Sequence, residues 1–388
     1  MALANTLTGL IPTLYAARDI VSRELTGLIP AVTIDASSAR AAKDQVVRVH
    51  ITPKLVAGDI TPAMTPPTPD SVAMGSVDMS ITKMRAVQVP WSGEEQQSIN
   101  ENGPGIDNVV RDQVAQAMRT LANEVETDLA GLYISTSRSF GTAGTAPFGT
   151  TPGISDAAQV RKILDDNGAP MFDRQLVINT SAGVNLRSLA QLTKANEAAT
   201  DATLRRGELL NLHGISIRES AQIKTHTKGT NSGATTNAAG YAIGATVITL
   251  ASAGTGTIVV GDSIVFTGDT NRYTVVSGDA SVADGGTITI AQPGLRQAIP
   301  ASATGITTGA NYAANMAFVR SSMILLARAP YLPGGRDMAS DRTMITDANT
   351  GITFEVARYD GYHAHFLEIS LSWGVKGIKP EHAAILLG

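Results

Sequence analysis

The sequence predicts an α+β protein in which helical and β-rich stretches occupy separate blocks of the chain. Three observations support this. An uninterrupted helical pattern spans Asp107–Tyr133, strand patterns flank a proline-rich stretch within residues 46–98, and residues 225–312 are rich in Gly, Thr and Ser. Apolar residues recur every three or four positions in the helical block and mostly at alternate positions in the strand patterns. We therefore expect one long helix and two distinct β-rich regions.

Composition limits the possible classes of function. The 388-residue chain carries 30 Lys and Arg against 34 Asp and Glu, which gives no strongly basic surface for gripping nucleic acid. It has no Cys, which excludes disulfides, thiolate metal sites and cysteine nucleophiles and suits assembly in a reducing cytoplasm. No apolar run approaches the roughly 20 residues of a membrane span, and the N-terminus lacks the basic start of a secretion signal. We expect no membrane association.

The first 45 residues contain a repeated motif. Leu-Thr-Gly-Leu-Ile-Pro occurs at residues 7–12 and again at residues 25–30. The apolar residues of one amphipathic helical face are Leu14, Ala17, Val21, Leu25 and Leu28. A solitary helix of this length is marginal in water, so it needs a surface to pack on. We predict that residues 1–45 form an arm that docks on a neighbouring molecule through Leu14, Val21 and Leu25; the alternative is the first helix of a globular domain.

Residues 46–98 predict a long two-stranded excursion that leads into the helix. Alternating apolar residues at Val47–Ile51 and Val77–Ile81 flank a proline-rich crest, and the alternation returns at Val87–Trp91. Proline cannot donate to a β ladder, so the crest cannot continue a sheet. Because an isolated hairpin is only marginally stable, we expect something outside the excursion to hold its tip. The contact candidates are Pro66, Pro67 and Trp91.

The long helix at Asp107–Tyr133 has one apolar face. Its central apolar positions are Val114, Met118, Leu121 and Val125. At about 1.5 Å per residue the helix is roughly 40 Å long. The opposite face carries polar residues that include Arg119, Asn123 and Glu126, so only the apolar face is expected to be buried, against a sheet of the same chain. Periodicity alone favours an ordinary core helix.

The rest of the chain predicts a mixed domain interrupted by an all-β region. Helical patterns begin at Ser155 and again around Leu186, with a buried strand pattern at Gln175–Asn179 between them. Residues 225–312 contain short strand patterns separated by Gly turns, which is typical of a small barrel or sandwich. Its core candidates include Val247, Leu250, Ile264, Phe266, Ile288 and Ile290. Strand patterns return between Gly351 and Leu387.

Catalytic and metal-binding motifs are weak. Residues 254–256, Gly-Thr-Gly, have no helical pattern after them, so they do not form a dinucleotide loop. His363, His365 and Glu368 are possible metal ligands, but on a strand Glu368 points away from the two histidines. The sequence therefore predicts a protein that is not an enzyme and has no catalytic residues, no cofactor and no metal.

Several stretches carry a family resemblance, taken together with the order of the predicted parts. They are Asn179–Ile223, Gly261–Phe266, Asn315–Pro330, Trp373–Val375 and Lys379–Ala383. The chain resembles the Hong Kong 97-type major capsid proteins of tailed phages, most closely the coat proteins of short-tailed Salmonella phages. The resemblance implies an N-terminal arm (1–45), an extended E-loop (46–98), a spine helix and peripheral domain (99–150), the first part of an axial domain (151–224), an inserted β-barrel domain (225–312) and a return through the axial and peripheral domains (313–388).

The resemblance implies a structural role. Copies of the chain would assemble as hexamers and pentamers into an icosahedral shell that encloses double-stranded DNA without sequence-specific binding. Assembly would pass through a scaffolded procapsid that expands on packaging, with a scaffolding protein and a portal as partners. The protein would be formed in the bacterial host cytoplasm and located in the virion. Two alternatives remain: an encapsulin-like compartment shell of the same fold, and a hydrolase or similar enzyme, for which the sequence offers no catalytic constellation.

Overall fold

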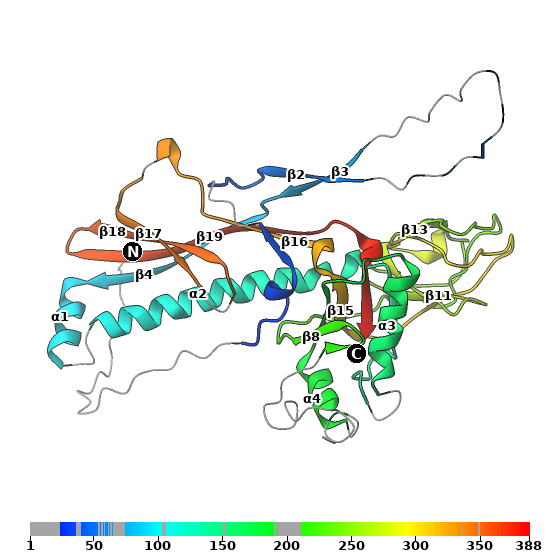
Figure 1. The fold of residues 1–388 in the computed structure, drawn as a ribbon, viewed down its shortest axis with the longest axis horizontal. Coiled ribbons are helices and arrows are strands. Elements are labelled where there is room, and N and C mark those ends of the chain that lie inside the picture. The colour runs from blue at the N-terminus through cyan, green and yellow to red at the C-terminus, as the bar shows by residue number, and fades with distance from the viewer. Residues whose placement is uncertain are drawn as a thin grey trace.

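The computed structural model describes residues 24–35, 40–52, 74–102, 106–149, 153–189, 211–335, 337–347 and 350–388, together with residues 55, 57, 59, 60, 62, 64 and 192. These residues form an elongated molecule with one long helix running along its length (Figure 1). A large sheet lies beside the helix at one end, a second sheet with two shorter helices forms the other end, and a hairpin projects from the body.

The sheet beside the helix has six strands. Their bounds are β1 (Thr33–Asp35), β4 (Lys83–Ser92), β16 (Met323–Arg328), β17 (Ala339–Thr346), β18 (Thr353–Gly361) and β19 (Ala364–Gly377). The order is β1-β16-β19-β18-β17, and β4 pairs with the other edge of β19. All the pairs are antiparallel except β1 with β16. The long strand β19 therefore joins the whole sheet.

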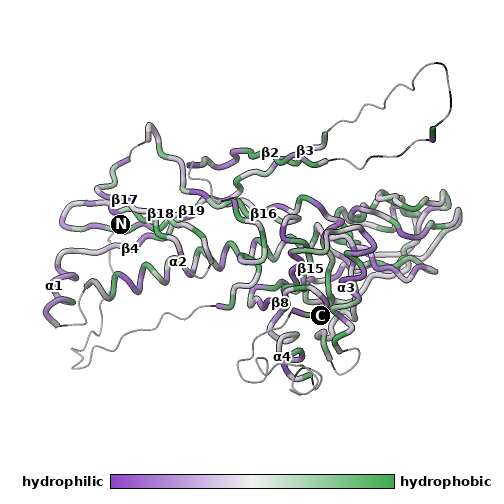
Figure 2. Tube along the Cα trace, in the orientation of Figure 1, coloured by the Kyte–Doolittle hydropathy of each residue, from purple (hydrophilic) through white to green (hydrophobic). Residues whose placement is uncertain are grey.

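Helix α2 (Ile106–Ala130) covers one face of this sheet, and the 3-10 turn η2 (Gly131–Ser135) follows it. Leu121 and Val125 pack in one cluster with Phe354, Ile369 and Trp373 from the sheet. Figure 2 shows alternating hydrophobic and hydrophilic bands along α2, as expected of a helix with an apolar face. The helix was predicted to end at Tyr133; the last three predicted residues tighten into the 3-10 turn instead.

The projecting hairpin consists of β2 (Val46–Ile51) and β3 (Gly75–Ser80), which pair with each other and with no other strand that the structure describes (Figure 1). The sequence assigned all of residues 46–98 to the excursion, whereas β4 joins the six-stranded sheet and α1 (Gly93–Asn102) follows it. The start of α1 is marked by a reciprocal cap: Glu95 N donates to Ser92 Oγ at 3.3 Å, and Ser92 N donates to Glu95 Oε2 at 2.9 Å. The Ser-x-x-Glu spacing was the available sequence signal.

The second sheet has twelve strands and begins with those of the mixed domain. These are β5 (Arg138–Phe140), β6 (Arg174–Ile178), β7 (Asn211–Leu212), β8 (Ile215–Glu219), β15 (Tyr312–Val319) and β20 (Ala383–Leu387). Helices α3 (Ser155–Asp166) and α4 (Thr180–Ser188) share a core with them, in which Leu164, Leu186 and Leu176 are buried. Short 3-10 turns lie at Ile29–Ala31, Arg320–Ser322, Pro333–Gly335 and Pro380–His382.

Residues 225–312 contribute the remaining strands. They are β9 (Thr225–His226), β10 (Val247–Thr249), β11 (Ser263–Phe266), β12 (Arg272–Ser277), β13 (Thr287–Ile290) and β14 (Ile306–Thr308), with a 3-10 turn at Val282–Asp284. Ile264, Phe266 and Ile288 lie in a buried cluster formed within this segment. Val247 was expected in that core and is instead 53% exposed, because the strand register places Ile248 inward. The segment also pairs with the rest of the sheet through β12 with β5 and β9 with β15.

Candidate functional site

An N-terminal strap, residues 24–35, crosses helix α2 and is held by a buried carboxylate. Glu126 has no exposed surface, although it lies on the helix face predicted to be polar. Its Oε1 accepts the backbone N–H groups of Gly27 and Leu28, each at 2.7 Å, and its Oε2 accepts that of Ile29 at 2.9 Å. Hydrogen bonds to an ionised acceptor are stronger than neutral ones. One side chain therefore satisfies three consecutive amides of the strap.

The strap is also fixed on both sides of this contact. Glu24 forms an ion pair with Arg119 and accepts a hydrogen bond from Asn123. The hydrogen bond from Arg119 has the larger effect and that from Asn123 the next, and together they lower the pKa of Glu24 to about 2. Beyond the contact, β1 adds a parallel strand to β16. The strap residues Leu28, Ile29, Ala31 and Val32 are fully buried in the same cluster as the apolar face of α2.

The strap fits into a narrow slot at Gly27. A Cβ atom at this position would lie 2.3 Å from the backbone oxygen of Glu219, at the end of β8. Two residues earlier, the Leu25 carbonyl accepts the backbone N–H of Ala221 at 3.0 Å. The strap therefore passes between α2 and the mixed domain, and only glycine leaves room for this approach.

The strap corrects the prediction that only one face of the long helix is buried. Glu126 and part of the Arg119–Asn123 surface face the strap. Periodicity missed this because a carboxylate counts as polar, whether it faces water or a row of backbone amides. On the apolar face, Val114 is half-buried, and Met118, Leu121 and Val125 are buried.

The residues predicted to contact a neighbouring molecule differ in their exposure to solvent. Leu25 is 47% exposed at the start of the strap. Trp91 is only 2% exposed, and its indole N–H donates to Gln113 Oε1 of α2 at 3.1 Å, so the expectation that Trp91 faces a neighbouring molecule is wrong. Leu14, Val21, Pro66 and Pro67 lie outside the described residues.

The hairpin presents an incompletely covered apolar surface. At its base Met79 is buried with Ala41 and Leu326, and half-buried Val47, Val49, Ile51 and Val77 continue that cluster along the two strands. Large apolar residues are also exposed at its outer end: Leu55, Ile60, Met64 and Met74. An exposed apolar surface of this kind marks a site of association. The hairpin is therefore the stronger candidate for contact with another molecule.

A buried polar network joins the end of the long helix to residues 225–312. Tyr133 Oη lies 3.0 Å from His226 Nδ1, and His226 Nε2 lies 2.9 Å from Asp262 Oδ1. Asp262 also accepts the backbone N–H of Gly229 at 3.0 Å, and Tyr312 donates to the Gly261 carbonyl at 2.5 Å. Burial raises the pKa of both tyrosines. The residues resemble an acid–base relay, but Asp262 is fully buried and therefore out of reach of a substrate in solution. The hydrogen bonds of this network instead connect the end of the long helix to residues 225–312.

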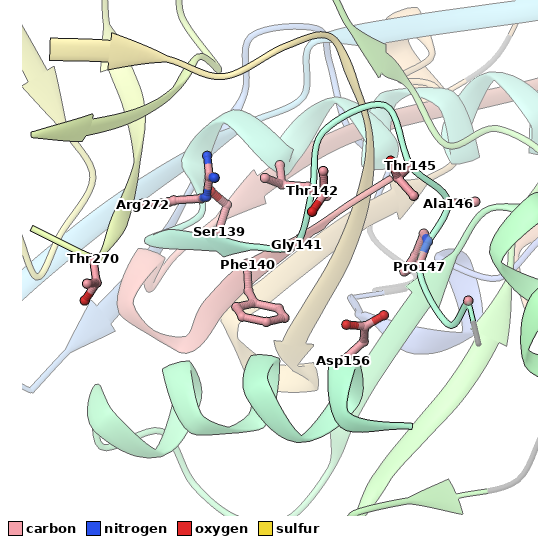
Figure 3. Close-up of a pocket in the computed structure, with 12 residues that line it drawn as sticks. Ser139, Phe140, Gly141, Thr142, Thr145, Ala146, Pro147, Asp156, Thr270 and Arg272 are labelled. Carbon is pink, nitrogen blue, oxygen red and sulfur yellow. The ribbon is translucent and has the colours of Figure 1, made fainter. Parts of the chain in front are cut away.

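A cavity of about 340 Å³ lies between β5, the start of α3 and the turn before β12. Figure 3 places Arg272 and Asp156 on opposite sides, with Thr142 and Thr145 on the loop between them. The Asp156 carboxylate accepts the backbone N–H of Phe148 at 2.8 Å, and burial raises its pKa. Phe148 has a φ of 61°, so this hydrogen bond stabilises a left-handed turn. Asp156 therefore has a local structural partner.

The histidines considered as metal ligands are not on one strand face. His363 lies in the turn between β18 and β19 with a φ of 50°, and His365 on β19 contacts Gln96. Within the described part of the chain, no group of three His, Asp or Glu is placed to hold a metal ion. A search of the same residues finds no helix that is both long and apolar enough to cross a membrane.

No model of a known protein family matches this sequence, and no curated protein matches it. Among solved structures, a chain in the capsid structure of the cyanophage P-SCSP1u is similar over 99% of this chain and 92% of its own, with a TM-score of 0.52 and 13% identity. The chain has a phage-capsid fold. Chains from Mycobacterium phage Che8 (TM-score 0.49, 14% identity, 98% of both chains) and the capsid of Myoviridae phage XM1 (0.46, 9%, 96% of both) are also similar to it.

In this fold the strap and the hairpin are attached to the same structural body. The six-stranded sheet and α2 form one body, the strap is bound inside it, and the hairpin extends from its edge (Figure 1). The sequence identified the hairpin but missed Glu24 and Glu126, which anchor the strap. The repeated Leu-Thr-Gly-Leu-Ile-Pro motif was the only sequence signal near the strap.

Proposed function

We propose that this chain is the major capsid protein of a tailed bacteriophage, with a Hong Kong 97-type fold related to the coat proteins of short-tailed Salmonella phages. The observation that carries the proposal is the similarity in fold to a chain of a cyanophage capsid over 99% of this chain and 92% of that one. Agreement over nearly the whole length of both chains favours a shared role over a shared domain, although fold alone does not determine function.

In this role, copies of the chain assemble as hexamers and pentamers into an icosahedral shell that encloses double-stranded DNA. The hairpin supports self-association, because Val49, Val77 and Met74 are incompletely covered by their own chain. A net charge of -4 suits a wall that contains DNA without gripping it. A scaffolded procapsid, a portal, expansion on packaging, assembly in the host cytoplasm and final location in the virion complete the proposal.

We also propose that residues 225–312 form an inserted β-barrel domain of this capsid protein. The buried cluster around Phe266 supports this, because all its members come from that segment. In the full chain, Phe266→Ala should destabilise the segment by about 3–5 kcal/mol. Hydrogen exchange should then accelerate in residues 225–312 and stay unchanged in α2. Equal acceleration in both regions would show one cooperative unit and contradict the inserted domain.

The direct test of the capsid role is assembly. Purified chain should sediment as closed shells in electron micrographs, either alone or with a scaffolding protein. A matched variant in which a short Gly-Ser turn replaces residues 46–80 should keep the circular dichroism of the body and form no shells. A wild-type chain that stays monomeric in the lysate of its native host, or a hairpin-free variant that closes normally, would contradict the proposal.

The contents of native particles separate the capsid from its alternative. A phage shell should contain double-stranded DNA, which nuclease-protected extraction would detect. A shell that contains a defined protein cargo and no DNA would indicate the encapsulin-like compartment instead. The same purification therefore tests shell formation and the identity of the shell.

A further inference from the structure

The contact between the strap and helix α2 has the properties of a peptide-binding site. Define the Glu126 cradle as the Glu126 carboxylate together with the slot beside the Glu219 backbone oxygen. The bound segment is Leu25–Pro30, whose amides at Gly27, Leu28 and Ile29 donate to the carboxylate. Backbone amides are common to almost every sequence, so this carboxylate alone does not select its ligand.

Selectivity comes from the side chains on either side of those amides. Gly27 is required because a Cβ atom there would lie 2.3 Å from the Glu219 oxygen. Leu28 and Ile29 follow it, and both are fully buried in the core beside α2. Pro30 is the second residue of the 3-10 turn Ile29–Ala31, a position where its missing N–H costs nothing. The cradle therefore requires glycine followed by two large aliphatic residues, and it accommodates proline next.

The same six residues occur a second time in the chain, at Leu7–Pro12. Gly9 matches Gly27, and Leu10 and Ile11 match the two buried residues. We infer that Leu7–Pro12 is a second ligand of the Glu126 cradle, and that it exchanges with Leu25–Pro30 of the same chain. In the exchange the first repeat replaces the second, and the residues between the repeats leave the cradle region together with the displaced second repeat as one loop.

The flanking residues determine which repeat holds the cradle in the resting subunit. Glu24 precedes the second repeat and pairs with Arg119 and Asn123, whereas Thr6 stands at the matching position of the first. After the second repeat, Ala31 and Val32 are fully buried and β1 pairs with β16. The first repeat is followed by Thr13 and Leu14 in place of Ala31 and Val32, and its binding also requires closure of a loop. Leu25–Pro30 is therefore the ground state, and Leu7–Pro12 is the reserve ligand.

A same-chain ligand is favoured over one from a second copy. A repeat tethered to the subunit has a high effective concentration at the cradle, whereas a second copy must first meet a subunit whose cradle is empty. The exchange is a property of the soluble subunit, so it stands or falls independently of the proposed shell.

Hydrogen exchange followed by mass spectrometry tests the exchange, because the two repeats lie in peptides of different mass. In Gly27→Ala the second repeat no longer fits, so exchange in residues 7–12 should slow about tenfold relative to wild type. The double variant Gly9→Ala/Gly27→Ala should lose that protection. Gly9→Ala alone is the control and should leave the strap protected.

A second variant covers the case in which Gly27→Ala does not fold. Glu24→Thr makes the residue before each repeat identical and leaves the cradle intact, so protection of residues 7–12 should rise at the expense of residues 25–30. The proposal is overturned if residues 7–12 gain no protection in a folded Gly27→Ala or Glu24→Thr chain. It is also overturned if their protection disappears on dilution, since that would identify a second copy as the source of the ligand.

Discussion

The strap and the hairpin are both extended segments, but they satisfy their polar and apolar groups in opposite ways. The strap donates three amides to Glu126, and its residues Leu28 and Ile29 are fully buried within the chain. Among the described strands, those of the hairpin pair only with each other, and the hairpin leaves Val46 54% and Met74 68% exposed. A segment whose groups are all satisfied internally belongs to the folding unit. A segment with uncovered apolar surface has free energy available for association.

From this comparison we expect the strap to stabilise the folded subunit and the hairpin to mediate shell assembly. Changes in the α2 core and the strap should lower the free energy of unfolding of the isolated subunit. Changes at the outer end of the hairpin should leave that free energy nearly unchanged and affect shell formation. Four predictions test this division.

The largest effect is expected for Leu121→Asp. Leu121 is buried in the cluster that holds both the sheet and the strap, so the substitution places an unpaired charge in an apolar core. The free energy of unfolding should fall by about 4 kcal/mol or more. Thr120→Asp is the matched control, because Thr120 is exposed on the same helix, and it should cost about 0.5 kcal/mol or less. Urea unfolding measures both, and a stable Leu121→Asp chain would place the wrong face of α2 in the core.

Glu126→Ala should come next. It leaves three buried amides of the strap without an acceptor, at a cost of about 3 kcal/mol or more in unfolding free energy. Glu124→Ala removes an exposed ion pair with Arg85 on the same helix and should cost less than about 1 kcal/mol. Equal losses in urea unfolding would mean that the strap contributes little to the folded subunit, and the contrast with the hairpin would fail.

A smaller effect is expected from the pH dependence of Glu24. Its pKa is lowered to about 2 in the folded chain by Arg119 and Asn123, against an ordinary value of 4.5. The ionised form is therefore favoured by folding, and its stabilisation is complete above about pH 4.5 and lost as the pH falls toward 2. Wild type should exceed Glu24→Gln in stability at pH 6 by more than at pH 3. A difference that is constant between these pH values would show that Glu24 does not bind Arg119 in solution.

The smallest change in subunit stability is expected for Met74→Ser, at the exposed position just before β3. The side chain of Met74 is largely exposed and packs little against its own chain, so the free energy of unfolding should change by about 0.5 kcal/mol or less. If the proposed shell role holds, the yield of closed particles in sucrose gradients should nevertheless fall. A large loss of subunit stability would place Met74 in an internal core and remove the distinction between hairpin and strap.

Local pattern was sufficient for many secondary elements. The spacing of Met118, Leu121 and Val125 predicted both the helix and the side that packs on the sheet. Strand patterns located β2 and β3 to within about two residues, because alternation along a strand is a local property. The core candidates Phe266 and Ile288 likewise fall in β11 and β13. The core candidate Val247 falls in β10, but the expectation that it points inward is wrong. Short strands do not fix their own register.

The sequence by itself determined the long helix, the two strands of the projecting hairpin, and a repeated Leu-Thr-Gly-Leu-Ile-Pro motif whose purpose it did not reveal. The tertiary structure decided that Trp91 is internal and that Glu126 is a buried anchor. The reason is the same for both residues. A large ring or a carboxylate is stable in the interior only when a partner far along the chain completes its packing and hydrogen bonds, and nothing in the local sequence shows where that partner will lie.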